Sequence, residues 1–285
     1  MIVVKLMGGM GNQMFQYALG RSISLRYGQE LKLDLSFLKD TNRDEDFVMR
    51  DFDLDIFNIN ASIFTPQDKL HNAVLLRENS SCDYIPGLLQ QCDEYSGHDF
   101  YLEGYFQKHQ YVDEIRETLL QEFSLKEDIQ EDSIELASQI ASANSVCINI
   151  RRADFVHNEK NAPFHGFYGQ DYVKAAIPYI LEKNDNPHFF VFSDDIEWCE
   201  KNIVTGYDTT FVGHDHKGKK FGQYMKLMSM CKDFIIPNSS FAWWAAWMNS
   251  GSPTVVTPLK WFQADHVNTE DLRPNSWIKL GVDCE

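Results

Sequence analysis

The stretch that decides the fold is residues 1–34, MIVVKLMGGMGNQMFQYALGRSISLRYGQELKLD. The β-branched run Ile2–Met7 predicts a strand, and the glycine turn Gly8–Gly11 follows it. Within Gln13–Tyr27 the apolar residues recur at helical spacing, and Glu30–Asp34 predicts a second strand. A strand, a helix and a strand in this order form a βαβ unit, whose two strands lie parallel in one sheet.

The same alternation returns along the chain, except in residues 35–96, where acidic and aromatic residues mix and no order is assigned. Strands are predicted at Phe100–Gly104, Ser145–Ile150, His188–Ser193, Asp208–Val212, Asp233–Pro237 and Thr254–Thr257. Helices are predicted near Val112–Phe123, Ser133–Ala143, Gln170–Glu182, Ile196–Asn202, Phe221–Met230 and Ser240–Met248. Short buried strands that alternate with helices are typical of a parallel, doubly wound sheet.

We therefore predict an α/β protein with two Rossmann-like domains that face a cleft, each built on a parallel, doubly wound sheet. The N-terminal domain is expected over residues 1–142 and the C-terminal domain over residues 143–285. The polar stretch Lys126–Ser133 is the best candidate for a linker.

Composition narrows the class of partner. Hydrophobic residues make up 44% of the chain and aromatic residues 13%, so a sizeable packed core is expected. The formal net charge of −16 argues against nucleic acid and anionic membrane surfaces as main partners, because both favour a basic face. The six cysteines show neither a C-x-x-C pair nor zinc-like spacing. Since neither a signal peptide nor a transmembrane run is recognisable, we expect a cytoplasmic protein with reduced thiols.

Charged and polar side chains follow three of the predicted strands, where the ligands of open parallel sheets bind. In chain order they are Arg151, Arg152 and Asp154, then Asp194 and Asp195, then Asn238, Ser239 and Ser240. An arginine fork suits a diphosphate, a helix start offers N–H groups to an anion, and an aspartate accepts hydrogen bonds from a ribose or a guanine edge. Taken singly, each group also fits surface charge or a helix N-cap. Together they describe a site for a nucleoside diphosphate.

Two further patterns are compatible with a metal ion. Asp51-Phe52-Asp53 has the D-x-D spacing that some transferases use for a nucleotide-bound cation, and His214-Asp215-His216 could place two imidazoles on one face of a strand. An acidic surface and a solvated loop beside Lys217–Lys220 are the favoured interpretations. No metal and no cofactor is therefore expected.

Several blocks of the sequence match one enzyme family. Asn149–Asp154 is similar to the H-x-R-R-x-D motif of fucosyltransferases, and Phe192–Asp195 and Asn238–Trp247 match two more blocks of one branch. Gly8–Ala18 and Gly104–Gln107 belong to the same pattern. Over nearly its whole length, and in the right order, the chain resembles the bacterial α-1,2-fucosyltransferases of glycosyltransferase family 11.

This resemblance implies an inverting, metal-independent galactoside α-1,2-fucosyltransferase with two Rossmann-like domains of the GT-B type. It would move L-fucose from GDP-β-L-fucose to the 2-hydroxyl of a terminal β-galactoside. Residues 1–142 would form the acceptor-side domain, and residues 143–285 would bind GDP-fucose. The acceptor would be an oligosaccharide or a glycolipid, and peripheral contact with a lipid-linked acceptor stays open.

The resemblance also implies roles for individual residues. Arg151 would act in catalysis by binding the donor diphosphate, and Asp154 is a candidate base by position. The donor-binding set would be Arg151, Arg152, Asp194, Asp195, Asn238, Ser239, Ser240 and Phe241. The residues facing the cleft from the acceptor side would be Gly9, Gly11, Asn12 and Gln13. The chain departs from the family at Asn149, where histidine is usual, and this departure questions a proton-transfer role at that position.

Two other function classes stay open. Gly9-Met10-Gly11 after a strand and Asp34 at the end of the next fit an NAD(P)-dependent oxidoreductase, although Met14 occupies the position of the third glycine. A non-catalytic nucleotide-sugar or glycan-binding protein would keep the scaffold without the chemistry, and Asn149 is compatible with that interpretation.

Overall fold

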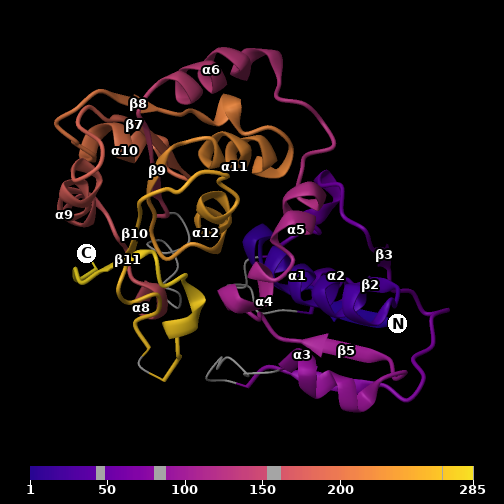
Figure 1. The fold of residues 1–285 in the computed structure, drawn as a ribbon. Coiled ribbons are helices and arrows are strands. Elements are labelled where there is room, and N and C mark those ends of the chain that lie inside the picture. Colours follow the sequence, from indigo (N-terminus) through magenta and orange to yellow (C-terminus); the bar gives the residue numbers. More distant parts are fainter. Residues whose placement is uncertain (43–48, 80–87, 153–161, 265, 285) are drawn as a thin grey trace. The chain divides into compact units, whose positions relative to one another are not determined.

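The computed structural model describes residues 1–42, 49–79, 88–152, 162–264 and 266–284, which form two compact units (Figure 1). Unit 1 comprises Met1–Lys126 and His266–Pro274, and unit 2 comprises Glu127–Asp265 and Asn275–Glu285. The units divide after Lys126, where the expected linker stretch begins, rather than after residue 142. The difference arises because helix α6 (Ile134–Ser142) packs on strand β6 (Ser145–Ile150) and so belongs to unit 2.

Unit 1 is built on a parallel sheet with the strand order β3-β2-β1-β5-β4. Its strands are β1 (Ile2–Lys5), β2 (Leu31–Asp34), β3 (Ser62–Ile63), β4 (Val74–Arg77) and β5 (Phe100–Glu103). Its helices are α1 (Met10–Tyr27), α2 (Ser36–Lys39), α3 (Leu88–Gln91), α4 (His109–Asp113) and α5 (Arg116–Glu122), with 3₁₀ turns at Leu54–Ile56, Cys92–Tyr95 and Glu270–Leu272. The predicted helix Val112–Phe123 is thus two short helices, α4 and α5.

The βαβ unit expected from residues 1–34 is confirmed. Strand β1 pairs in parallel with β2, and Ile2 lies opposite Leu31. Helix α1 ends at Gly28, whose φ of 61° is the left-handed conformation that commonly terminates helices. A side chain at Gly20 would place its Cβ 2.3 Å from Cγ2 of Val4, so this close approach of helix and strand requires glycine.

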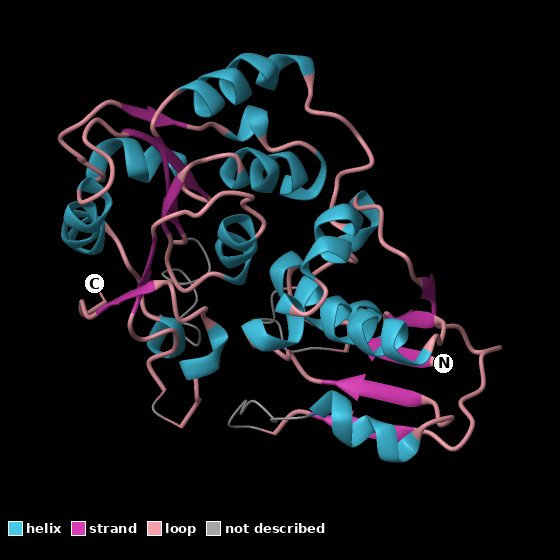
Figure 2. Cartoon of the chain, viewed as in Figure 1, coloured by secondary structure: helices cyan, strands magenta, loops and turns pink. Residues whose placement is uncertain are grey.

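Unit 2 is built on a second parallel sheet, and Figure 2 draws the strands of both units in magenta. The strand order in this sheet is β11-β10-β9-β6-β7-β8. Besides β6, its strands are β7 (His188–Ser193), β8 (Thr209–Phe211), β9 (Asp233–Ile235), β10 (Val255–Pro258) and β11 (Ile278–Leu280). Besides α6, its helices are α8 (Ala162–His165), α9 (Gln170–Leu181), α10 (Ile196–Asn202), α11 (Gly222–Ser229) and α12 (Ser240–Trp247), with 3₁₀ turns at Glu131–Ser133, His214–His216 and Lys219–Phe221. Within the described ranges, every helix is too short or too polar to span a bilayer.

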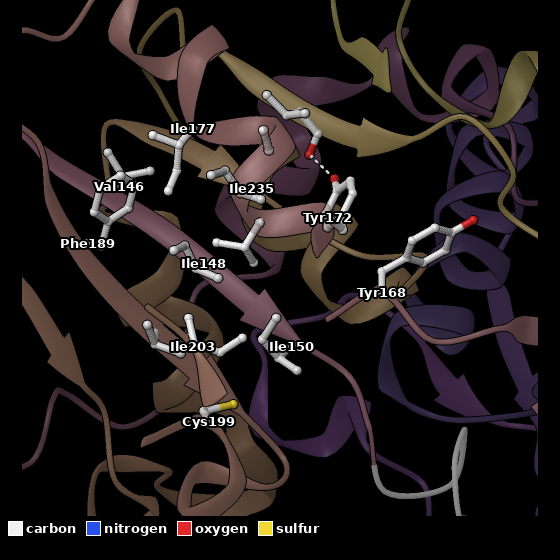
Figure 3. Close-up of a cluster of buried hydrophobic side chains, with 14 of the residues drawn as sticks. Val146, Ile148, Ile150, Tyr168, Tyr172, Ile177, Phe189, Cys199, Ile203 and Ile235 are labelled. Carbon is white, nitrogen blue, oxygen red and sulfur yellow. Dashed lines mark hydrogen bonds between the residues drawn. The ribbon is translucent and has the colours of Figure 1, made fainter. Parts of the chain in front are cut away.

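The core of unit 2 fixes the strands that carry the candidate site. Val146, Ile148 and Ile150 alternate along β6 and join a buried cluster with residues of α9 (Figure 3). The Tyr172 hydroxyl of α9 donates to the carbonyl oxygen of Val256 at 3.0 Å, which ties the helix to the sheet. Both units therefore have the parallel sheets that the sequence predicts, and the α/β class with two Rossmann-like domains is confirmed.

Candidate functional site

The candidate site lies at the carboxyl edge of the unit 2 sheet. Strands β9, β6 and β7 are neighbours, so the segments that follow them leave the sheet side by side. The structure brings together at this edge Arg151 and Arg152 after β6, Asp194 and Asp195 after β7, and Asn238–Ser240 after β9. The predicted candidate base, Asp154, lies outside the described residues.

Two arginines and two aspartates form an ion-pair ladder between the ends of β6 and β7, called here the Arg–Asp ladder. Arg151 Nη1 lies 3.0 Å from Asp194 Oδ2, and Arg152 Nη1 lies 2.5 Å from Asp195 Oδ2. The backbone N–H of Arg152 donates to Asp194 Oδ1 at 2.9 Å. The four side chains are between 18% and 28% exposed, so they are held in place and still within reach of a ligand.

The second rung of the ladder also supports helix α10. Asp195 is the N-cap of this helix, and its Oδ1 accepts the N–H of Trp198 at 3.2 Å. The guanidinium carbon of Arg152 lies 5.0 Å from the ring centre of Trp198, within cation–π range. Burial raises the pKa of the nearby Cys199 thiol to about 12, so this cysteine stays protonated and is no nucleophile at neutral pH.

Asn238 lies buried in the loop after β9. Its side chain is 3% exposed, and its Nδ2 donates to the carbonyl oxygens of His165 at 2.7 Å and Trp261 at 3.0 Å. The amide therefore joins this loop to α8 and to the segment after β10. The sequence suggests Asn238 for donor binding, and the structure shows that its Nδ2 is engaged by two backbone carbonyl oxygens.

The start of α12 presents backbone N–H groups at the same sheet edge. Ser239 is the N-cap, and its Oγ accepts the N–H of Ala242 at 3.4 Å. Ser240 and Phe241 in the first turn are partly exposed, while the rest of the helix is buried. A helix start of this kind stabilises an anion through its N–H groups and its dipole.

Gln13 holds in place the glycine loop of unit 1, Gly8–Gly11, which leads from β1 into α1. Gln13 has no exposed surface; its Nε2 donates to the carbonyl oxygens of Gly8 at 2.9 Å and Asp51 at 2.7 Å, and its Oε1 accepts the N–H of Asp53 at 2.9 Å. Gln13, expected to face an acceptor, thus holds the loop to the D-x-D segment. In the described part of the chain, no three His, Cys, Asp or Glu residues are grouped so that they could hold a metal ion.

The other residues expected on the acceptor side, at the start of α1, differ in exposure. Gly9 is the N-cap of α1 and is partly exposed, whereas Gly11 is buried. Asn12 is partly exposed, and its Oδ1 accepts a hydrogen bond from Gln107 Nε2 at 2.6 Å. Asn12 therefore connects the first turn of α1 to the segment after β5.

Sequence reasoning missed a strained turn after β8. Lys220 and Phe221 are adjacent and have φ values of 51° and 61°, a conformation that is costly for side chains of this size. The ring of Phe221 packs against His214, whose Nε2 lies 2.8 Å from the carbonyl oxygen of Ser193 at the end of β7. The sequence holds no signal for this conformation, because neither residue type favours a left-handed backbone.

The two histidines considered as metal ligands have separate partners. His214 contacts Ser193, and His216 Nδ1 lies 2.9 Å from Ser133 Oγ. They lie in a 3₁₀ turn and not on the strand that a metal site was considered to require. Their hydrogen bonds serve the packing of the sheet edge.

Asn149 faces the neighbouring strand. Its side chain is 7% exposed, and its Nδ2 donates to the carbonyl oxygen of Phe192 at 3.2 Å. The hydrogen bond ties β6 to β7 just before the Arg–Asp ladder. At this position the side-chain amide therefore links two neighbouring strands.

A sequence profile for glycosyl transferase family 11 matches residues 1–281. The chain belongs to this family. An α-1,2-colitosyltransferase of Escherichia coli is 34% identical over an alignment of 299 positions, which covers 98% of each chain. Galactoside α-(1,2)-fucosyltransferase 1 of Rattus norvegicus is 28% identical over 146 residues, which are 48% of this chain and 38% of that protein.

The fold of this family 11 glycosyltransferase is also similar to that of a solved fucosyltransferase, NodZ from Bradyrhizobium. The TM-score is 0.51 at 15% sequence identity, and the match covers 86% of this chain and 90% of NodZ. At such low identity the likeness concerns the fold alone. It agrees with the predicted GT-B type of fold, which is built from two Rossmann-like domains.

Membership of glycosyltransferase family 11 argues against an NAD(P)-dependent oxidoreductase, and so do the surroundings of two residues of the dinucleotide-like motif. In this family 11 glycosyltransferase, Asp34 is already engaged at the end of β2: its Oδ2 accepts the Tyr101 hydroxyl at 2.5 Å and its Oδ1 accepts the Ser36 N–H at 2.8 Å. Met14 is fully buried in α1, where the third glycine of a dinucleotide motif would stand.

Proposed function

We propose that this glycosyltransferase moves L-fucose from GDP-β-L-fucose to the 2-hydroxyl of a terminal β-galactoside, with inversion at the anomeric carbon. The observation that carries the proposal is the Arg–Asp ladder beside the start of α12, within segments that match α-1,2-fucosyltransferase motifs. Residues 143–285 would bind the donor and residues 1–142 the acceptor. A cytoplasmic location and an oligosaccharide or glycolipid acceptor are part of the proposal, as is transient contact with a lipid-linked acceptor.

The ladder would stabilise the leaving diphosphate. Negative charge grows on the β-phosphate as the bond to fucose breaks, and a guanidinium fork with fixed direction stabilises that charge best. We assign this task to Arg151, helped by the N–H groups of Ser240 and Phe241. Asp194 bonds through both oxygens to the two arginines, so we assign it to orienting Arg151 in preference to holding guanosine.

The direct test is incubation with GDP-fucose and a panel of galactosides, with the linkage of the product determined by NMR. The expected product carries fucose α-1,2-linked to galactose. Transfer solely to another position, such as the 3-hydroxyl of N-acetylglucosamine, would contradict the proposed acceptor. Saturable binding of GDP-fucose without turnover on any acceptor would instead favour a non-catalytic sugar-binding protein.

A second donor is suggested by the E. coli relative named as a colitosyltransferase, which is similar over 98% of both chains. Colitose is fucose without the 3-hydroxyl, so GDP-colitose could use the same diphosphate contacts. A site that hydrogen-bonds the 3-hydroxyl discriminates strongly against a sugar that lacks it. The ratio of kcat/KM for GDP-fucose and GDP-colitose on one acceptor therefore decides between the two donors.

We expect activity to survive chelation. The charge that a cation would supply is available from Arg151 and from the start of α12, and the backbone of the D-x-D segment is held by Gln13. Turnover of GDP-fucose should stay within about two-fold of its initial value in excess EDTA, since none of these groups needs a metal. Loss of turnover with EDTA and its recovery with Mn²⁺ or Mg²⁺ would show that the diphosphate scheme is wrong.

We expect Asn149 to act only by positioning neighbouring groups, without taking part in proton transfer. Replacing it with alanine leaves the Phe192 carbonyl oxygen without this partner, which should lower the stability by about 1 kcal/mol and reduce kcat/KM without changing its pH profile. Asn149→His places a larger ring in a buried site and should be destabilising by about 1–3 kcal/mol. The measurement is kcat/KM against pH for the wild type and both variants. An Asn149→His enzyme that outperforms the wild type at neutral pH would mark the chain as an impaired relative that has lost a base.

A further inference from the structure

A carboxylate at the edge of the unit 1 sheet is held by a turn built around it. Glu78 directly follows β4, and its Oε2 accepts the backbone N–H groups of Tyr105 at 2.8 Å and Phe106 at 3.1 Å. Phe106 has a φ of 52°, an unfavourable conformation that helps both N–H groups to reach one oxygen. A Cβ at Gly104 would lie 2.5 Å from Glu78 Cβ, so glycine is needed to let the carboxylate approach.

The same turn is tied to the glycine loop. Gln16 Nε2 donates to the carbonyl oxygen of Gly104 at 3.2 Å, and Gln107 Nε2 donates to Asn12 Oδ1 at 2.6 Å. Strands β1, β5 and β4 are neighbours in the sheet, so the segments after them form one rim at its carboxyl edge. This is the edge at which ligands of open parallel sheets bind, and carboxylates and amides are natural partners of sugar hydroxyls.

The surroundings of Glu78 suit proton uptake. Burial raises the pKa of this carboxyl group, while the N–H groups of Phe106 and Tyr105 and the positive charge of Lys108 act in the opposite direction. Lys108 is itself buried and donates to the carbonyl oxygen of Asn268 at 3.0 Å. The neighbouring Arg77 is paired with Glu103 at 2.6 Å.

The two oxygens of Glu78 differ in what they contact. Both backbone hydrogen bonds reach Oε2, and among the described residues none reaches Oε1. Three aspartates at the carboxyl edges of the two sheets have both oxygens engaged: Asp34 with Ser36 and Tyr101, Asp194 with Arg152 and Arg151, and Asp195 with Trp198 and Arg152. Glu78 therefore combines a fixed orientation with an oxygen available to a substrate.

We propose that Glu78 binds the reacting hydroxyl of the acceptor sugar and takes its proton during transfer. The inference rests on the proposed function. As the hydroxyl oxygen forms its bond to the anomeric carbon of fucose, the bond from that carbon to the β-phosphate oxygen breaks. The electron pair of the broken bond stays with GDP, and the hydroxyl proton moves to Oε1 of Glu78.

The first test is Glu78→Gln, which keeps the shape of the side chain and removes the base. Transfer should fall by about 10²-fold or more in kcat, the usual contribution of a general base, while GDP affinity stays unchanged. In the wild type, kcat/KM should fall as the pH drops through the raised pKa of Glu78, and this acid limb should be absent from the Gln variant. Glu78→Asp keeps a titratable group, so it should keep the limb at a lower rate.

Matched variants separate proton transfer from structural damage. Glu103→Gln removes a carboxylate of the same sheet that is paired with Arg77 and Lys5. It should leave kcat within about two-fold, because these partly exposed ion pairs contribute little and Glu103 has no part in the proposed proton transfer. Gly104→Ala should displace the intact Glu78 carboxylate and lower kcat, whereas Gly281→Ala, whose methyl would lie 3.7 Å from Leu259, should not. Thermal unfolding and GDP affinity of each variant report on the fold.

A Glu78→Gln enzyme that transfers fucose within a few-fold of the wild type, or that keeps the acid limb, would overturn the inference and leave the proposed function intact. An Asp variant without the limb would also overturn it. If the wild type transfers no sugar from GDP-fucose or GDP-colitose to any galactoside, the proposed function itself fails.

Discussion

Arg151→Ala should lower kcat/KM for GDP-fucose by about 10³-fold, in the range observed when a group that stabilises developing negative charge is removed. The reason is geometric as well as electrostatic. Arg151 is oriented by Asp194 at 3.0 Å, on a segment that follows a fully buried strand, so its guanidinium is preorganised for the diphosphate. Arg151→Lys should also lose about 10²-fold, because an ammonium cannot reproduce a two-pronged contact.

The control for this prediction is Arg26→Ala. Arg26 also forms a short ion pair with an aspartate, Asp93 at 2.7 Å, but both side chains are well exposed and lie in unit 1. Its loss should leave kcat/KM within about two-fold, since exposed pairs contribute little. GDP affinity and thermal unfolding should be measured for both variants. An Arg151→Ala enzyme with near-normal kcat/KM would remove Arg151 from the donor site.

The parts of the fold that were predictable are those whose pattern is local. Strands β6 and β7 begin and end where the sequence predicts, because a parallel strand covered on both faces is a continuous apolar run. The edge strands β3 and β4 were not predictable, because β3 has only two residues and the alternating exposure of β4 leaves the apolar Leu75 exposed. Their place in the sheet depends on pairing with β2 and β5, which lie far away in the sequence.

The candidate site also has parts that could be predicted from the sequence and parts that could not. The approach of Arg151 to Asp194 follows from strand order and from the rule that ligand-binding residues follow parallel strands. The structural uses of Gln13 and Asn238 could not be predicted, because each amide bonds to segments remote in sequence, residues 51–53 in one case and His165 and Trp261 in the other. The Glu78 carboxylate was missed for the same reason, since its partners lie after the next strand of the sheet.

Helix α12, which starts at the proposed donor site, is held by aromatic packing. Trp243 of α12 has no exposed surface and lies 5.1 Å from Trp244, 6.0 Å from Trp247 and 5.5 Å from Trp277, measured between ring centres. A helix that is apolar on every side belongs in the interior of a protein. Its partly exposed first turn is therefore placed by the burial of the turns that follow.

Trp243→Ala should accordingly lower the free energy of unfolding by about 3–5 kcal/mol, the range for truncating a fully buried tryptophan. Equilibrium unfolding in urea measures this loss, with Val204→Ala as the control. Val204 is 66% exposed in the same unit, and its truncation should change stability by less than about 0.5 kcal/mol.

GDP should raise the midpoint of unfolding of the wild type, because a ligand that binds the folded state stabilises it. This shift should shrink in the Trp243→Ala variant if the start of α12 holds the diphosphate. A Trp243→Ala protein that loses less than about 1 kcal/mol, or that keeps the full GDP-induced shift, would show that the packing of α12 does not set the position of its first turn.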